Sequence, residues 1–333
     1  MTETTPSTDD PCIAVTGAAG FIGSRVIKRL REEHPEWDVL ALDNFYRGQL
    51  RQIADVTVQH VDIRNRCRLE EALEGADVVV HLAAVSGVDD CKANADLAQA
   101  VNVGGTNAVA WFCRKTGAGM VFPSSMAVLG DPEQFPITAD HPRQPMNWYG
   151  RTKMMGESAV DAMAEDAFPA HLFLISNLYG EHVVDGRRVS KGTVINFFVS
   201  RAFADESLTV YEPGTQARNY VHVKDVANAY VRSTERLLGQ LAAGETGSRK
   251  YEIASDEDPS IRAVAELVRD LTAEETGSEP PIELVENPRS NETLVSEFSV
   301  DTAKAEAELN WEAKCGIEDS VRTLLAERLG SAD

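Results

Sequence analysis

A glycine-rich turn near the N-terminus constrains the fold of this chain more than any other stretch. The turn, Thr16-Gly-Ala-Ala-Gly-Phe-Ile-Gly23, follows the apolar residues 12–15 and opens an amphipathic stretch, so the pattern predicts strand, turn and helix. Gly17 allows the tight turn, Gly20 lets the backbone approach a phosphate, and Gly23 lets the helix pack on the strand. Free N–H groups at the start of a helix attract anions. The turn therefore predicts a dinucleotide site, with an ordinary glycine turn as the alternative.

A second predicted strand, residues 38–43, ends in an acidic residue that supports this interpretation. Asp43 has the spacing expected of a carboxylate that binds the adenosine ribose hydroxyls. It favours NAD over NADP, because a carboxylate repels a 2′-phosphate. Two alternatives stay open: Asp43 caps the next turn, or Arg47 accepts NADP. A third predicted strand, residues 56–61, leads to Asp62, which could accept a hydrogen bond from the adenine amine.

Strand and helix patterns alternate through the first half of the chain. This alternation predicts a doubly wound α/β sheet with right-handed crossovers. From about residue 181 short strands and helices predict a smaller α+β lobe that closes on the carboxyl ends of the sheet. We expect a nucleotide-binding domain over residues 11–180, to which later segments can return, and a substrate lobe over residues 181–330. The expected strands lie at residues 76–82, 119–123 and 171–176, and the expected helices at residues 21–33, 96–115 and 148–167.

Composition excludes several classes of protein. The net charge is −21, from 53 acidic and 32 basic residues, and such a surface repels nucleic acid. No apolar run reaches the roughly 18 residues that span a bilayer, and no signal segment is visible, so we expect a cytoplasmic protein. The five cysteines are scattered and show no C-x-x-C spacing, which predicts free thiols and neither disulfides nor a metal site.

A phenol and an ammonium group lie four residues apart in the middle of the chain. Tyr149 and Lys153 would share one face of a helix, downstream of a predicted strand that ends at Ser124 and Ser125. A tyrosine with an ordinary pKa near 10 is a poor base, but a lysine charge and a nicotinamide cation both favour its phenolate. The spacing alone usually means a surface pair. Combined with the serines and the glycine turn, it predicts acid–base chemistry.

In these motifs the chain resembles the extended short-chain dehydrogenase/reductase family, in its NAD-dependent nucleotide-sugar epimerase/dehydratase branch. The resemblance covers about residues 12–311 and implies a Rossmann fold. It implies that Tyr149 is the acid/base, that Lys153 tunes it, and that Ser125 binds the reacting hydroxyl. The residues that it places around NAD are Gly17, Gly20, Phe21, Ile22, Gly23, Asp43, Asn44, Asp62, Ile63, Leu82, Ala83, Ala84, Asn102, Ser124, Tyr149 and Lys153.

The resemblance also points to a substrate. It implies that Asn177, Arg218 and Arg289 hold a sugar-nucleotide diphosphate. Dehydratases of the family carry an Asp-Glu pair where this chain has Met126 and Ala127, so dehydration is not expected. We therefore expect a UDP-hexose 4-epimerase. The alternatives are a dehydrogenase or reductase acting on a free sugar or aldehyde, and a non-catalytic NAD-sensing regulator.

Other features carry weaker expectations. The basic residues Arg187, Arg188 and Lys191 are expected in a solvated loop, with a lid that faces phosphates as the alternative. His81 and His222 are expected to be structural. By family resemblance, a homodimer would pair through the helices at residues 96–115 and 148–167.

The acidic excess suggests adaptation to a high-salt cytoplasm, with a merely acidic protein as the alternative. At about 1 M salt the Debye length falls to about 3 Å, so the self-repulsion of the surface is screened. We predict that the midpoint of thermal unfolding rises from low to molar KCl. A midpoint that stays constant or falls would contradict the hypothesis.

Overall fold

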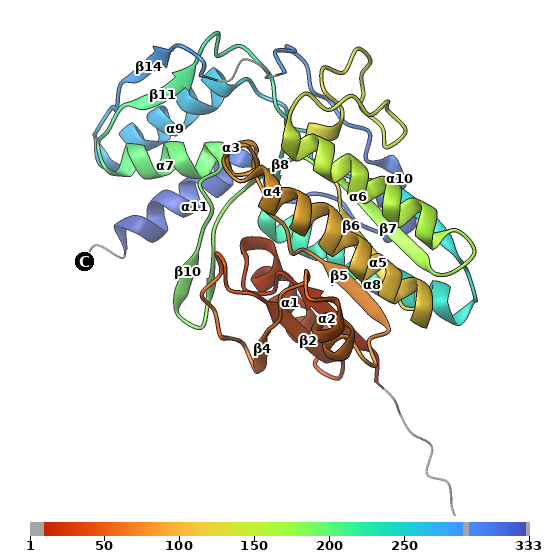
Figure 1. Ribbon diagram of the computed structural model, residues 1–333. Helices are drawn as coiled ribbons and strands as arrows, with labels where there is room; N and C mark the ends of the chain where they lie inside the picture. Colours follow the sequence, from red (N-terminus) through yellow and green to blue (C-terminus); the bar gives the residue numbers. More distant parts are fainter. Residues whose placement is uncertain (1–9, 289–292, 331–333) are drawn as a thin grey trace, which may run out of the picture.

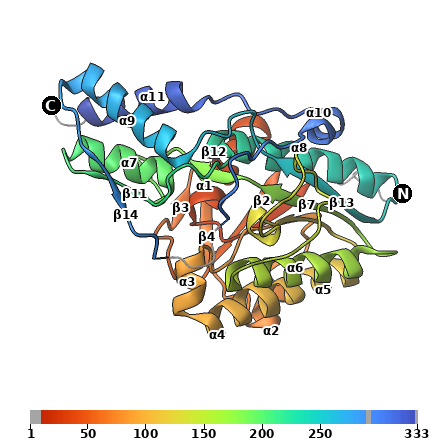
Figure 2. The ribbon, with the colours of Figure 1, turned by 90° about the horizontal axis from the view of Figure 1, so that it is seen from above.

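A mostly parallel sheet forms the centre of the molecule, and helices cover both of its faces (Figures 1 and 2). The structure is a computed structural model that describes residues 10–288 and 293–330. In these residues the large sheet has eight strands in the order β13-β7-β6-β5-β1-β2-β4-β3. Their bounds are β1 Cys12–Thr16, β2 Asp38–Asp43, β3 Gln52–Ile53, β4 Val56–His60, β5 Val78–His81, β6 Gly119–Pro123, β7 Pro169–Ile175 and β13 Gly247–Ile253.

The strand order confirms the predicted doubly wound sheet. β1 lies between β2 and β5, and only the short β3 pairs antiparallel, with β4. Every residue of β5, β6 and β7 is buried, as expected of parallel strands covered on both faces. All five parallel strands from the first half of the chain therefore end at the same edge of the sheet. The turns that follow β1 and β5 lie at this edge.

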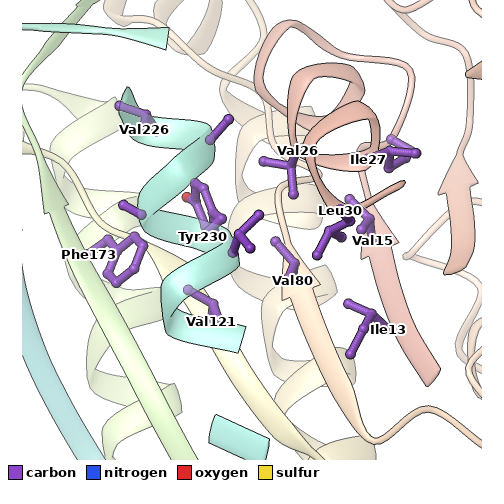
Figure 3. Packing of buried hydrophobic residues seen from close by; sticks show 14 of the residues in the cluster. Ile13, Val15, Val26, Ile27, Leu30, Val80, Val121, Phe173, Val226 and Tyr230 are labelled. Carbon is purple, nitrogen blue, oxygen red and sulfur yellow. The ribbon is translucent and has the colours of Figure 1, made fainter. Parts of the chain in front are cut away.

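One face of the sheet is covered by helices from the two halves of the chain. α1 (Phe21–Glu33) and α8 (Val223–Ala242) pack against each other there. Figure 3 shows Leu30 of α1 and Tyr230 of α8 in the same apolar cluster as Val80 of β5. The second half of the chain thus supplies both a covering helix, α8, and an edge strand, β13, to the large sheet.

The opposite face is covered by α2 (Arg66–Ala72), α5 (Thr106–Thr116) and α6 (Trp148–Ala164). The helix predicted over residues 96–115 consists of α4 (Ala95–Ala98), a π-helical segment (Gln99–Gly105) and α5. A Cβ atom on Gly105 would lie 2.3 Å from Cδ1 of Ile63. The close packing expected at this glycine is confirmed.

A smaller lobe stands beyond the edge where the strands end (Figure 1). Its helices α7 (Val194–Phe203), α9 (Ile261–Thr276) and α11 (Ile317–Leu329) share one apolar cluster with β11 (Leu208–Tyr211). β11 pairs with β14 (Ile282–Val285). β8 (Asn177–Tyr179) pairs with β12 (Tyr220–His222) where the chain passes between the lobes, and β9 (His182–Val184) with β10 (Arg187–Val189) forms a hairpin.

The C-terminal part of the chain is fixed to both lobes. Trp311 is buried, and its Nε1 donates to the carbonyl oxygen of Asp225 at 2.8 Å. α10 (Ala303–Leu309) ends at Asn310, whose φ of 49° lies in the left-handed region that asparagine tolerates. The cysteines are free, as expected. Among the described residues, every helix is too short or too polar to cross a membrane.

The turn at Gly17 should tolerate no side chain. Its φ is +70°, and a Cβ atom there would lie 2.7 Å or less from Ala83 N and the Leu82 carbonyl carbon. We predict that Gly17→Ala destabilises the protein by at least about 2 kcal/mol, measured by urea unfolding. Gly104→Ala is the matched control: no atom lies within 4 Å of its Cβ position. It should be neutral or stabilise by up to about 1 kcal/mol, and equal losses in both variants would show that the contact at Gly17 does not limit stability.

Candidate active site

A long cleft runs along the carboxyl edge of the large sheet and is closed on its other side by the smaller lobe. Its volume is about 970 Å³, at the upper end of the roughly 300–1,000 Å³ usual for ligand sites. Most of the residues predicted to form the site line it: Gly17, Gly20, Phe21, Ile22, Gly23, Asp43, Asn44, Ile63, Leu82, Ala83, Ala84, Ser124, Ser125, Tyr149, Lys153, Asn177 and Arg218. The cleft therefore brings together groups from both halves of the chain.

The glycine turn fits a dinucleotide phosphate. Gly20 is the N-cap of α1, and its position brings no side-chain acceptor to the first N–H groups of the helix. Thr16 fixes the turn from below: its Oγ1 lies 2.8 Å from Nδ1 of His81 and accepts from Ala83 N at 3.2 Å. The anionic pyrophosphate would take the place of the missing cap. His81 is therefore structural, as predicted, and burial lowers its pKa to about 3, so the ring is neutral.

Asp43 is held at the adenosine end of the cleft. Its two carboxylate oxygens accept from Ala19 N at 3.0 Å and from Phe45 N at 2.7 Å. Burial raises the pKa of this carboxyl group, and the two backbone hydrogen bonds oppose the shift. The turn-capping and ribose-binding interpretations are thus compatible, since each oxygen keeps a second lone pair. Arg47 lies 2.6 Å from Asp90 in an ion pair, so its charge is engaged elsewhere.

Two residues assigned to the cofactor do not line the cleft. Asp62 forms an ion pair with Arg64 at 2.6 Å, which holds the pKa of the carboxyl group far below its usual range, and it accepts from Asn44. Asn102 lies behind the wall: its amide bonds to Val85 and to Oγ1 of Thr152 at 3.0 Å. Both residues bond to the chain itself, and their contact with NAD stays a prediction.

The predicted acid–base group lies at the carboxyl end of β6. Asn147 caps α6, with Oδ1 accepting from Gly150 N at 2.9 Å, and so places Tyr149 in the first turn. Burial raises the pKa of Tyr149 to about 12, opposed by a side-chain hydrogen bond with Ser125. Without a ligand the residue is therefore a phenol at neutral pH, hydrogen-bonded to the serine predicted to share its substrate.

Lys153 lies one helical turn further along α6 and is almost fully buried. Its Nζ donates to the Pro123 carbonyl oxygen at 2.8 Å and lies 5.1 Å from the centre of the Phe122 ring. Burial lowers the pKa of Lys153 to about 8, and the charge of Lys191 lowers it further. The hydrogen bond fixes the ammonium group at the end of β6.

A buried carboxylate that the sequence-based prediction missed supports this group. Glu157 accepts from Ser124 Oγ at 2.7 Å and pairs with Arg143 at 2.8 Å. Ser124 thus bonds to Glu157, whereas Ser125 bonds to Tyr149. The spacing of Glu157, four residues beyond Lys153 on the same helix, was the available signal.

The substrate side of the cleft is polar. Asn177 donates to the Asn219 carbonyl oxygen at 3.0 Å, and Arg218 donates to the carbonyl oxygens of Ala217 and Thr293 at 2.7 and 2.6 Å. These bonds hold Arg218 at the wall of the cleft. Arg289, the other predicted cation, lies outside the described residues. Met126 and Ala127 also line the cleft, and neither can transfer a proton.

The expected solvated basic loop is found for Arg187 and Arg188, which are exposed, whereas Lys191 is partly buried. Arg187, Arg188 and Lys191 all line the cleft, because the β9–β10 hairpin lies along it. Arg188 pairs with buried Glu181 at 3.3 Å, and Lys191 donates to Ser86 Oγ at 2.9 Å. Sequence distance hid these contacts, since Ser86 lies 105 residues before Lys191.

The fold and the site define the class of protein: an NAD-binding enzyme of the extended short-chain dehydrogenase/reductase type. The model of the NAD dependent epimerase/dehydratase family matches residues 13–245, and the chain belongs to this family. The members of this family are enzymes, so the alternative of a non-catalytic regulator is not supported.

Comparison with individual proteins agrees. The chain is 29% identical over 321 residues to the putative UDP-glucose 4-epimerase of Methanocaldococcus jannaschii, covering 94% of this chain and 97% of the relative. It is 27% identical to the UDP-glucose 4-epimerase of Bacillus subtilis, covering 92% and 94%. Among solved structures, MoeE5 in complex with UDP-glucose and NAD has a TM-score of 0.78 and 25% identity, covering 96% of this chain and 99% of that one.

The buried ammonium group of Lys153 makes a testable contribution to stability. Because its folded-state pKa is depressed to about 8 from 10.5, the unfolded chain binds one more proton between these values. Between about pH 8 and pH 10.5 the free energy of unfolding of the wild type should therefore increase with pH. Relative to that of Lys153→Met, it should increase by up to about 1.4 kcal/mol per pH unit. Urea unfolding of both cofactor-free proteins at pH 7.5 and 9.5 measures this difference. A difference that does not change with pH would show that the pKa of Lys153 is not depressed.

Proposed function

We propose that this enzyme is an NAD-dependent epimerase of a nucleotide sugar, specifically a UDP-hexose 4-epimerase. The observation that carries the proposal is the hydrogen-bonded pair Tyr149 and Ser125 above buried Lys153, in one cleft with the glycine turn. The relatives named as UDP-glucose 4-epimerases and the UDP-sugar complexes of MoeE5 support the substrate class. The absence of a proton-transferring pair at Met126 and Ala127 supports epimerisation over dehydration.

The chain's own residues would divide the work as follows. NAD, when bound, accepts the hydrogen of the reacting carbon as hydride and later returns it, and its positive ring favours the phenolate of Tyr149. Ser125 hydrogen-bonds the 4-hydroxyl group, and Tyr149 removes its proton as the 4-keto sugar forms. Lys153 lowers the free energy of the phenolate by its charge. Tyr149 would return the proton to the C4 oxygen of the rotated keto sugar, and return of the hydride to the opposite face of C4 would invert that carbon with no net redox change.

The remaining residues would position the two ligands. Asp43 is placed to bind the adenosine ribose, and the start of α1 to bind the pyrophosphate. Asn177 and Arg218 are placed to hold the diphosphate of the sugar nucleotide, since an arginine at the cleft wall pairs well with phosphate oxygens. In this arrangement the NAD pyrophosphate lies at the glycine turn and the sugar-nucleotide diphosphate at the smaller lobe. Tyr149 lies between these two phosphate sites.

A homodimer forms part of the proposal. Trp111 on α5 is 40% exposed, which is unusual for so large an apolar side chain and supports pairing through the α5 and α6 face.

We predict that the enzyme interconverts UDP-glucose and UDP-galactose, as measured by chromatography, without accumulating NADH. Tyr149→Phe removes the proton-transferring oxygen and should lower kcat by about 10²–10⁴-fold. Tyr251→Phe is the matched control: its hydroxyl group bonds to Glu308, away from the cleft, and its loss should leave kcat unchanged. Full activity of Tyr149→Phe would contradict the mechanism. Net NADH formation from a free sugar would identify a dehydrogenase instead.

A further inference from the structure

A buried carboxylate lies directly behind the wall of the cleft, and the proposed mechanism gives it no role. Glu157 is 4% exposed and follows Lys153 by one turn of α6. It does not line the cleft, but it lines a separate polar pocket of about 200 Å³. Its hydrogen-bond partner Ser124 lines the cleft itself. Any effect of Glu157 on a ligand would therefore pass through that serine.

Both oxygens of Glu157 are held by other parts of the chain. Oε1 accepts from Nε of Arg143 at 3.0 Å and from Nη2 of the same guanidinium at 2.8 Å, and Nζ of Lys250 lies 3.5 Å away. Oε2 accepts from Ser124 Oγ at 2.7 Å. Arg143 comes from the segment before α6 and Lys250 from β13. These contacts fix the carboxylate behind the end of β6.

The ion pair decides the direction of the hydrogen bond at Ser124. A carboxylate in an ion pair only accepts hydrogen bonds, and a hydroxyl group has a single hydrogen. Ser124 donates that hydrogen to Glu157, so its oxygen can only accept from a group in the cleft. The ligand group that contacts the Ser124 hydroxyl must therefore be a hydrogen-bond donor.

The two serines at the end of β6 project in different directions. Ser125 has extended backbone angles, φ −156° and ψ 148°, so its side chain and that of Ser124 lie on opposite sides of the chain. Ser125 bonds to Tyr149, which in the proposed mechanism takes the proton of the sugar hydroxyl group. The other ligand at this end of the cleft is the nicotinamide ring. The only hydrogen-bond donors on that ring are the N–H groups of its carboxamide.

We propose that Glu157, held by Arg143, is a positioning residue that fixes the Ser124 hydroxyl group as an acceptor for the carboxamide N–H of NAD. Glu157 touches neither ligand and acts through Ser124. The inference goes beyond the proposed epimerisation, because it concerns the binding of NAD and holds for any sugar.

The test compares the binding of NAD with that of 3-acetylpyridine adenine dinucleotide, measured by calorimetry on the full-length chain without sugar. This analogue has an acetyl group in place of the carboxamide and therefore offers no N–H group at that position. The wild type should bind NAD about 10-fold more tightly than the analogue, as expected for one hydrogen bond. In Ser124→Ala this preference should fall below about 3-fold, because the acceptor is gone.

Variants of Glu157 test the positioning role. In Glu157→Gln, Arg143 keeps the amide oxygen because a guanidinium only donates, so the amide NH₂ group faces Ser124. The hydroxyl hydrogen then turns toward the cleft, and the preference for NAD should again fall below about 3-fold. Glu157→Asp keeps the charge but is one methylene shorter, and it should have the same effect. The double variant Ser124→Ala/Glu157→Gln should show no further loss of preference than Ser124→Ala. Glu235→Gln is the matched control: Glu235 pairs with Arg232 away from the cleft, and the preference should stay about 10-fold.

A wild type that binds the two dinucleotides equally overturns the inference, and this measurement needs no variant. A preference that survives in Ser124→Ala also overturns it. Equal weakening of both dinucleotides in the Glu157 variants would leave the preference intact, and it would assign Glu157 a general structural role instead. Because binding is measured without turnover, failure of the enzyme to epimerise UDP-glucose would count against the proposed function and not against this inference.

Discussion

The close approach of two backbone turns is the constraint on which the rest of the structure depends. At Gly17 the chain passes so near to Leu82 and Ala83 that any side chain would overlap them, and Thr16 and His81 lock the ends of β1 and β5 together. This contact leaves the start of α1 uncapped beside the carboxyl edge of the sheet. The candidate active-site residues of the large sheet lie at that edge, because the turns that follow parallel strands all lie on the same side of a sheet.

The acid–base group shows how the fold converts this arrangement into chemistry. Ser125 and the Pro123 carbonyl oxygen come from the end of β6, whereas Tyr149 and Lys153 come from the first turns of α6. The lysine is buried, and its hydrogen bond to Pro123 fixes the ammonium group one helical turn from the phenol. Glu157 and Arg143 hold the neighbouring Ser124, and Lys153 itself bonds to Pro123. Lys153 and Ser124 are thus fixed by the Pro123 carbonyl oxygen and by Glu157.

Local sequence patterns predicted the large sheet, the glycine turn and the Tyr149–Lys153 spacing, because each depends on residues close together in the chain. The bounds of α1 were predicted from its sequence pattern. The short strands β8, β9, β10 and β14 were missed, since three or four residues carry no clear period and form only by pairing with distant segments. Asn102 was predicted to contact the cofactor because the sequence motif places an amide near the cleft. The motif does not show that the amide is already hydrogen-bonded to Val85 and Thr152. The contact of Lys191 with Ser86 was not predicted for the same reason: it depends on where a hairpin from the second half of the chain meets the first.

That hairpin is attached at both ends. Lys28 of α1 donates to the Val183 carbonyl oxygen, Asp185 accepts from Ala54 N beside β3, and buried Glu181 joins Arg188 to Arg328 of α11. Residues 187–193, which follow the hairpin's turn, line the cleft. The position of this cleft wall therefore depends on contacts made by residues of α1, α11 and the segment beside β3 that do not themselves line the cleft.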